Sequence, residues 1–125
     1  MKRDMELLRK ILFTIEKQYK PGDGLMFGLS IDGYDLKTIA EHCDLLCQQG
    51  LITDYKPVWG DDTVLAFQVG NLSYVGFDYL ELFRNDDVWN KTKEEVDKKK
   101  LPKTIETLAK IAGIFTGNLI KELNG

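Results

Sequence analysis

The feature that most constrains the fold is the order of patterns between residues 34 and 70. An amphipathic run ends at Gly50, and an apolar run follows at once over residues 51–59. A polar turn, Gly60-Asp61-Asp62, then leads into a second apolar run over residues 63–69. Glycine at the end of a helical run and a short polar turn between two apolar runs are typical of a helix followed by a β-hairpin. We therefore predict a helix and a hairpin in series.

The helix, predicted over residues 35–49, carries one face suited to a core. Its apolar residues recur at intervals of three and four, as one face of a helix requires, and they are Leu36, Ile39, Ala40, Cys43, Leu46 and Cys47. Asp35 is a fitting N-cap and Gly50 a fitting C-terminal residue. A second row flanks this face, formed by Thr38, His42, Leu45 and Gln49, and the far side carries Lys37, Glu41, Asp44 and Gln48.

The rest of the chain alternates helical and extended patterns. We predict helices over residues 3–19, 74–85 and 88–100, a last helix after Pro102, and a strand or extended segment over residues 25–31. Pro57 predicts that the first hairpin strand is an edge strand, because proline has no N–H for a sheet ladder.

The predicted fold class is α+β, in the order helix, short strand, helix, hairpin, helix, with a C-terminal helical extension. This is the order of a winged-helix domain, in which the hairpin is the wing. We predict a winged-helix-like domain over residues 1–87 and a helical extension over residues 88–125, packed on the same core. Only one helix fits between the short strand and the wing, where the winged-helix plan has two.

Charge and hydropathy limit the function. The net charge is −3 and the isoelectric point is near 5.2, whereas a general nucleic-acid-binding domain usually has an isoelectric point above about 9. No apolar stretch approaches the roughly 20 residues needed to cross a bilayer, and the N-terminus has no signal-peptide core. We therefore expect a cytoplasmic protein that does not enter a membrane.

Three segments resemble a known family. The first is residues 1–12, and the second is Ile31-Asp-Gly-Tyr34 together with His42, Leu45-Leu46 and Gly50-Leu51-Ile52. The third is the block from Tyr74 to Lys93, with its glycine, aromatic, leucine, arginine, Asp-Asp, tryptophan and lysine positions. Together they resemble a family of small uncharacterised phage and prophage proteins, known only as a domain of unknown function. The resemblance implies a winged-helix-like fold and a phage or prophage background. It implies no activity, cofactor or catalytic residue.

No pattern for catalysis or metal binding stands out from the residues. Cys43 and Cys47 with His42 give too few ligands for a closed zinc site, and His42 and Cys43, as neighbours on a helix, do not face each other. Asp86 and Asp87 diverge on a helix, so we expect one of them to cap the following helix. Trp89 should then be buried, and Arg84 should bond a carboxylate nearby. We predict a non-enzymatic protein without a cofactor or metal.

Two binding hypotheses remain. The favoured one is docking of a host or phage protein through the second helix and the wing, with the contact residues Thr38, Glu41, His42, Leu45, Trp59, Asp61 and Asp62. An aromatic residue near the wing tip suits a protein contact. The alternative is a small DNA-binding transcriptional regulator, which uses the same elements or a lysine cluster for phosphate contacts. That lysine cluster comprises Lys91, Lys93, Lys98, Lys99, Lys100 and Lys103.

The last helix contains two glycines, Gly113 and Gly117, each of which costs roughly 1 kcal/mol relative to alanine. A close helix–helix contact would offset this cost. We expect that contact within the chain, with a homodimer through this helix as the alternative, so the protein is predicted to be a monomer or such a homodimer.

Overall fold

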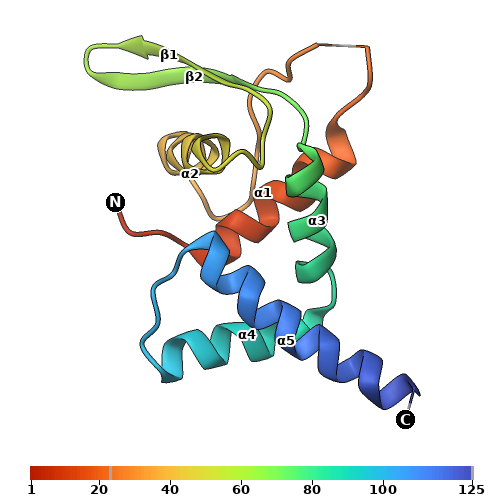
Figure 1. Ribbon diagram of the computed structural model, residues 1–125. Helices are drawn as coiled ribbons and strands as arrows, with labels where there is room; N and C mark the ends of the chain where they lie inside the picture. Colours follow the sequence, from red (N-terminus) through yellow and green to blue (C-terminus); the bar gives the residue numbers. More distant parts are fainter. Residues whose placement is uncertain (23, 125) are drawn as a thin grey trace. The chain divides into compact units, whose positions relative to one another are not determined.

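The computed structural model of the protein describes residues 1–22 and 24–124, which form two compact units. One unit is Glu6–Phe77, and the other is Met1–Met5 with Asp78–Gly125. The described residues form five helices and one antiparallel hairpin, so the predicted α+β class is confirmed. In chain order the elements are α1 (Met5–Gln18), α2 (Leu36–Gln48), β1 (Tyr55–Gly60), β2 (Thr63–Val69), α3 (Tyr74–Phe83), α4 (Asp86–Lys98) and α5 (Ile105–Asn124) (Figure 1). The predicted division at residue 87 stays a prediction.

The ends of α2 are set by local signals in the sequence. The Asp35 carboxylate accepts a hydrogen bond of 2.8 Å from the backbone N–H three residues later, which confirms it as the N-cap. At the other end Gly50 has φ +77° and donates to the Cys47 carbonyl, while Leu51 donates to the Leu46 carbonyl. These two bonds form a Schellman motif, which requires a left-handed residue where glycine fits best.

The hairpin packs against α2 and has a stem longer than its regular strands (Figure 1). The stem holds the bridge between Ile52 and Leu72, with further bonds from Thr53 N–H to the Asn71 carbonyl at 2.9 Å and from Gly70 N–H to the Asp54 carbonyl at 3.0 Å. The predicted first strand over residues 51–59 therefore pairs along its length, but regular strand geometry begins only at Tyr55.

Within the sheet β1 pairs only with β2 among the described residues, so the edge position predicted for Pro57 is confirmed. The backbone N–H and C=O of Val69 both bond to Met26, on the side away from β1. Tyr55 and Val69, although paired, therefore exchange no hydrogen bonds. Since such pairs alternate along an antiparallel ladder, Pro57 also stands in a non-bonded pair, with Phe67. The missing N–H of the proline therefore costs the ladder nothing.

The segment over residues 25–31 is extended rather than a full strand. Met26 exchanges two backbone hydrogen bonds with Val69, of 2.7 and 3.0 Å. Pairing stops there, and Gly28 has φ +78°, a conformation that favours glycine. The remaining outer edge of β2 is left without a strand partner among the described residues.

The start of α3 is held against the end of α2. Ser73 donates from its backbone N–H to the Leu51 carbonyl at 2.9 Å and from its hydroxyl to the Gly50 carbonyl. The same hydroxyl accepts from Gly76 N–H at 3.0 Å and so caps α3. A Cβ at Gly76 would lie closer to the Leu51 carbonyl oxygen than 3.0 Å, the shortest distance that real Cβ atoms keep from other heavy atoms. Only glycine allows this approach of the two backbones.

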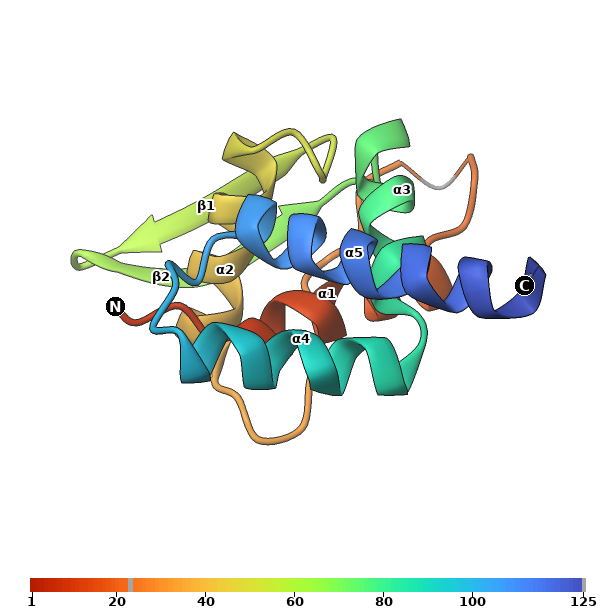
Figure 2. The same cartoon turned by 60° about the horizontal axis from the view of Figure 1, so that its bottom comes forward.

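The second unit contains α4 packed on α5, and Figure 2 shows the two helices running in opposite directions. Trp89 is buried, with its ring 5.1 Å from that of Phe83 in an edge-to-face arrangement, and Arg84 pairs with Glu81 at 2.7 Å. Both confirm the predictions for these residues. The predicted cap at Asp86 or Asp87 is wrong, because the side chain of Asn85 accepts from Val88 N–H at 3.0 Å, and the two aspartates form the first turn of α4.

No helix within residues 1–22 and 24–124 combines the length and the apolar character needed to cross a membrane.

The contact at Gly76 gives a stability prediction. Gly76→Ala should lower the free energy of unfolding by about 2 kcal/mol, because a methyl group placed against a backbone carbonyl forces the two segments apart. Urea denaturation measures this. The matched control is Gly113→Ala in α5, where an added Cβ meets no atom within 4 Å and alanine should stabilise the helix by about 1 kcal/mol. Equal effects of the two substitutions would contradict the close approach.

Candidate functional site

The hairpin tip is a two-residue loop of acidic residues. Asp61 and Asp62 have φ +49° and +66°, as a type I′ turn requires at both central positions. Aspartate tolerates this left-handed conformation better than most residues. The tip therefore holds two exposed carboxylates at the end of the hairpin.

A β-bulge lies next to the tip, and neighbouring side chains of β1 face opposite sides of the hairpin. Val58 pairs with Ala66 and Trp59 pairs with Val64, so Leu65 is the extra residue. A bulge bends the strand and re-aims the side chains beside it. Trp59 is 64% exposed and Val58 is 54% exposed, and they belong to two different hollows in this unit.

The first hollow lies between the outer side of α2 and the hairpin, and we call it the α2–hairpin groove. Its volume is about 310 Å³. Its lining residues come from α2 and both strands with the tip between them, and they are Lys37, Glu41, Asp44, Tyr55, Pro57, Trp59, Asp62, Thr63 and Val64. Three of these are carboxylates and one is a lysine.

Acidic side chains outnumber basic ones in the groove. Burial raises the pKa of the Tyr55 phenol to about 12, and the carboxylates of Asp44 and Glu41 add to the shift by disfavouring a second negative charge. Burial also raises the pKa of the Cys47 thiol, with Asp54 and Asp44 contributing in the same direction. Within the described part of the chain, neither groove carboxylate of α2 makes an ion pair. Their charge is therefore available to a partner.

The structure brings together part of the predicted docking set. Glu41, Trp59 and Asp62 line the groove, and Asp61 stands beside them at the tip. Thr38 and Leu45 are half-buried and do not line it.

The exposure predicted for His42 is wrong. His42 is 0% exposed, and its Nδ1–H donates to the Thr38 carbonyl at 2.8 Å. Position 42 lies three residues after Ile39 and four before Leu46, so it shares the buried stripe of α2. The bond to Thr38 satisfies one imidazole nitrogen and lowers the cost of burying the ring.

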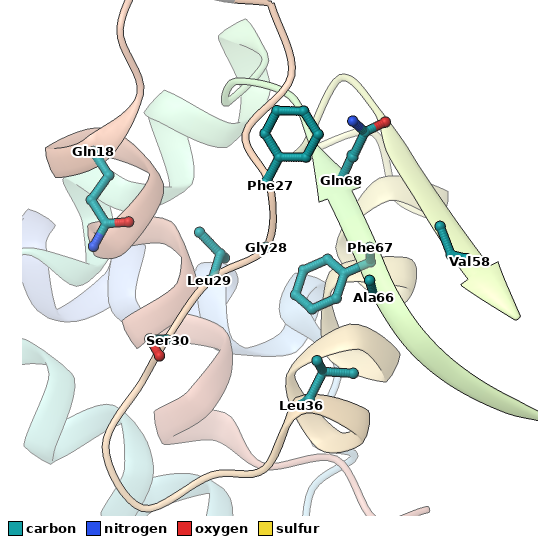
Figure 3. Close-up of a pocket in the computed structure, with 10 residues that line it drawn as sticks. All are labelled: Gln18, Phe27, Gly28, Leu29, Ser30, Leu36, Val58, Ala66, Phe67 and Gln68. Atoms are coloured by element: carbon teal, nitrogen blue, oxygen red, sulfur yellow. The ribbon is translucent and has the colours of Figure 1, made fainter. Parts of the chain in front are cut away.

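The second hollow lies beside the outer edge of β2, and we call it the apolar hollow (Figure 3). Its volume is about 590 Å³. Figure 3 shows side chains from the 27–30 segment, the start of α2 and both strands around it, and the lining residues are Gln18, Phe27, Gly28, Leu29, Ser30, Leu36, Val58, Ala66, Phe67 and Gln68. Phe27 is 88% exposed here, and Leu36 is 42% exposed, although the helical pattern predicted that Leu36 would be in the core.

Sequence reasoning missed the apolar hollow. Phe27 sits within an apolar run that predicts burial, and its exposure follows from the end of strand pairing after Met26. The only signal in the sequence is Gly28 next to Phe27, since glycine inside a strand pattern often marks an interruption.

The lysine cluster is partly neutralised within its own unit. Lys99 pairs with Glu95 at 2.5 Å, Lys103 lies 3.9 Å from Asp97, and the ammonium of Lys93 lies 6.0 Å from the centre of the Trp89 ring. Lys91, Lys98 and Lys100 are exposed. Their role in phosphate contacts stays a prediction.

The two glycines of α5 have free space around them. A Cβ added at Gly113 or Gly117 would meet no atom within 4 Å among the described residues. The close approach expected within the chain is therefore absent from that part of the structure, and a contact with a second subunit stays a prediction.

The thiols are in different surroundings. Cys43 is buried, and burial raises the pKa of its thiol from 9.0 to about 12, with Cys47 adding to the shift. Cys47 is half-buried on the same helix. No group of three His, Cys, Asp or Glu side chains in the described segments is arranged to hold a metal ion.

The raised pKa of Cys43 gives a pH dependence. The fold favours the neutral thiol, so this stabilisation is complete below about pH 9 and is lost as the pH rises toward 12. Cys43→Ala should lower the free energy of unfolding at neutral pH, by leaving a small cavity, but should make its decline above pH 9 shallower. Urea denaturation across this pH range measures the decline. Parallel profiles for the two proteins would contradict the assignment.

Comparison with known proteins gives a family and one relative. The family described as "Hypothetical protein (DUF2513)" matches residues 2–102. A protein of Haemophilus influenzae, described as "Uncharacterized protein", is 30% identical over 122 residues, covering 96% of this chain and 99% of that protein. No solved structure matches the chain.

Proposed function

This chain belongs to the DUF2513 family, and we propose that it is a non-enzymatic, winged-helix-like module that docks a protein partner. The docking surface consists of the α2–hairpin groove and the apolar hollow, which flank the same hairpin. The phage or prophage background and the cytoplasmic location implied above belong to this proposal as predictions.

The winged-helix-like description is supported by the order of elements in the unit Glu6–Phe77. A helix is followed by an extended segment that pairs at Met26 with β2, then by α2 and the hairpin. Residues 26–54, all of them described, contain α2 and no other helix. The helix pair that usually docks DNA is thus reduced to one helix in this part of the chain.

The observation that carries the proposal is the exposure of Trp59 beside carboxylates without ion pairs. A tryptophan that is 64% exposed at the rim of a groove resembles the aromatic anchors of protein interfaces. Phe27 and Val58 add exposed apolar surface on the other side of the hairpin, and contiguous exposed apolar surface is typical of interaction sites.

The charge of the same surface weighs against DNA. Phosphate contacts by lysine and arginine supply much of the affinity of DNA-binding proteins, yet the groove holds three carboxylates and only Lys37. The alternative, a small DNA-binding regulator, is supported by the order of elements alone.

The proposal predicts the effect of removing the aromatic anchor. Trp59→Ala should leave thermal stability unchanged, because the ring is largely exposed. It should lower the affinity for the partner by about 30-fold, as loss of a central hot-spot residue does. The measurement is affinity capture from host lysate with wild-type and variant protein, followed by titration of the captured protein.

The matched control is Tyr74→Ala, which removes another exposed aromatic side chain from the same unit but lies outside both hollows. The control should retain the partner. Equal retention by both variants would contradict docking through the hairpin.

A further inference from the structure

We propose that the α2–hairpin groove receives an arginine side chain from a basic segment of the partner. This inference deepens the proposed function and rests on it. Three features of the groove carry it: its size, the distribution of charge on its walls, and the aromatic ring at its rim.

The size of the groove suits one long side chain. Sites for small ligands have volumes of about 300–1,000 Å³, and the groove, at about 310 Å³, lies at the lower end of that range. Pro57 and Val64 provide apolar wall next to the aromatic residues. A long side chain with a charged end packs its apolar stem on such a surface and leaves the charge among polar groups.

The charge distribution, three carboxylates against the single lysine Lys37, favours a cationic occupant. Glu41 and Asp44 come from α2, and Asp62 comes from the hairpin tip, so carboxylates stand on both sides of the groove. None of the three makes an ion pair among residues 1–22 and 24–124. Burial raises the pKa of the Tyr55 phenol, and the carboxylates of Asp44 and Glu41 add to that rise. An anionic occupant, including a phosphate, would be repelled.

The aromatic rim favours arginine over lysine. Trp59 presents an exposed ring next to Asp62. A guanidinium group is planar, stacks on an aromatic face and donates to a carboxylate through two parallel N–H groups at once. A lysine ammonium is a strongly hydrated point charge that can pair with the acids but gains less from the ring. Trp59 and the carboxylates together therefore match guanidinium chemistry.

The test uses a defined peptide probe and the indole signals of the protein. The probe is the blocked peptide acetyl-Gly-Arg-Gly-Arg-Gly-amide, titrated into the ¹⁵N-labelled full chain to millimolar concentration. The chain has two tryptophans, so the exposed Trp59 and the buried Trp89 give two indole N–H resonances. The Trp59 resonance should move and saturate, while the Trp89 resonance should stay in place. A Trp59 resonance that does not move overturns the proposal.

Matched probes test the chemistry. The same peptide with citrulline keeps a planar end group of nearly the same shape, but a carbonyl oxygen replaces one nitrogen and the charge is lost, so it should bind at least tenfold more weakly. The lysine peptide should bind several-fold more weakly than the arginine peptide. Equal affinity of the citrulline peptide would overturn the charge argument, and equal affinity of the lysine peptide would overturn the choice of arginine.

Matched variants test the location. The double substitution Glu41→Gln with Asp44→Asn should lower the affinity for the arginine peptide at least tenfold. Glu94→Gln with Glu122→Gln makes the same change in net charge on exposed acids of the other unit and should leave the affinity unchanged. Equal weakening by both pairs would mean that the peptide responds only to overall charge, and would overturn the proposal.

Partner docking and arginine recognition are tested separately. If Trp59→Ala no longer captures the partner, but the Trp59 resonance of the wild-type protein does not respond to the peptide, docking is retained and arginine recognition is overturned. Retention of the partner in Trp59→Ala, together with an unmoved Trp59 resonance, would overturn both.

Discussion

The position of the hairpin over α2 depends on one close backbone contact, between the Leu51 carbonyl and the start of α3. Ser73 donates to this carbonyl, and Gly76 lets the first turn of α3 come against it. The contact returns the chain after β2 to the point where α2 ended, so the hairpin stem is closed at its base. Since the α2–hairpin groove has one wall from each element, its shape rests on this closure.

The groove then follows from features of the hairpin itself. Its two-residue acidic tip places Asp62 at one end, and Trp59 lines the groove with Tyr55 and Pro57, because alternate side chains of a strand share a face. On the other wall, the outer side of α2 presents Glu41 and Asp44. The buried residues of the unit lie elsewhere on the same elements. A surface with that combination of an aromatic ring and unpaired acids is suited to a cationic protein segment.

The sequence predicts what local chemistry decides. Asp35 and Gly50 set the ends of α2 through hydrogen bonds within a few residues, and Pro57 identifies an edge strand through its missing N–H. His42 shows where such reasoning fails. The polarity of the ring favours exposure, but its position on the buried stripe and the acceptor at Thr38 allow burial. Phe27 is the converse case, an apolar residue left exposed because pairing ends at Met26. Glu41 and Asp62 line one groove because the hairpin packs against α2, a tertiary contact that no local pattern predicts.

We propose that the surface formed by α2 and the hairpin binds protein rather than DNA. The most direct measurement is fluorescence anisotropy of a labelled mixed-sequence DNA duplex at about 50 and 200 mM salt, with wild-type protein. We predict no binding at the lower salt concentration, because the groove carboxylates repel phosphate and the lysine cluster is partly paired with acids. Micromolar or tighter binding that collapses at the higher salt concentration would show several phosphate contacts and would contradict the account.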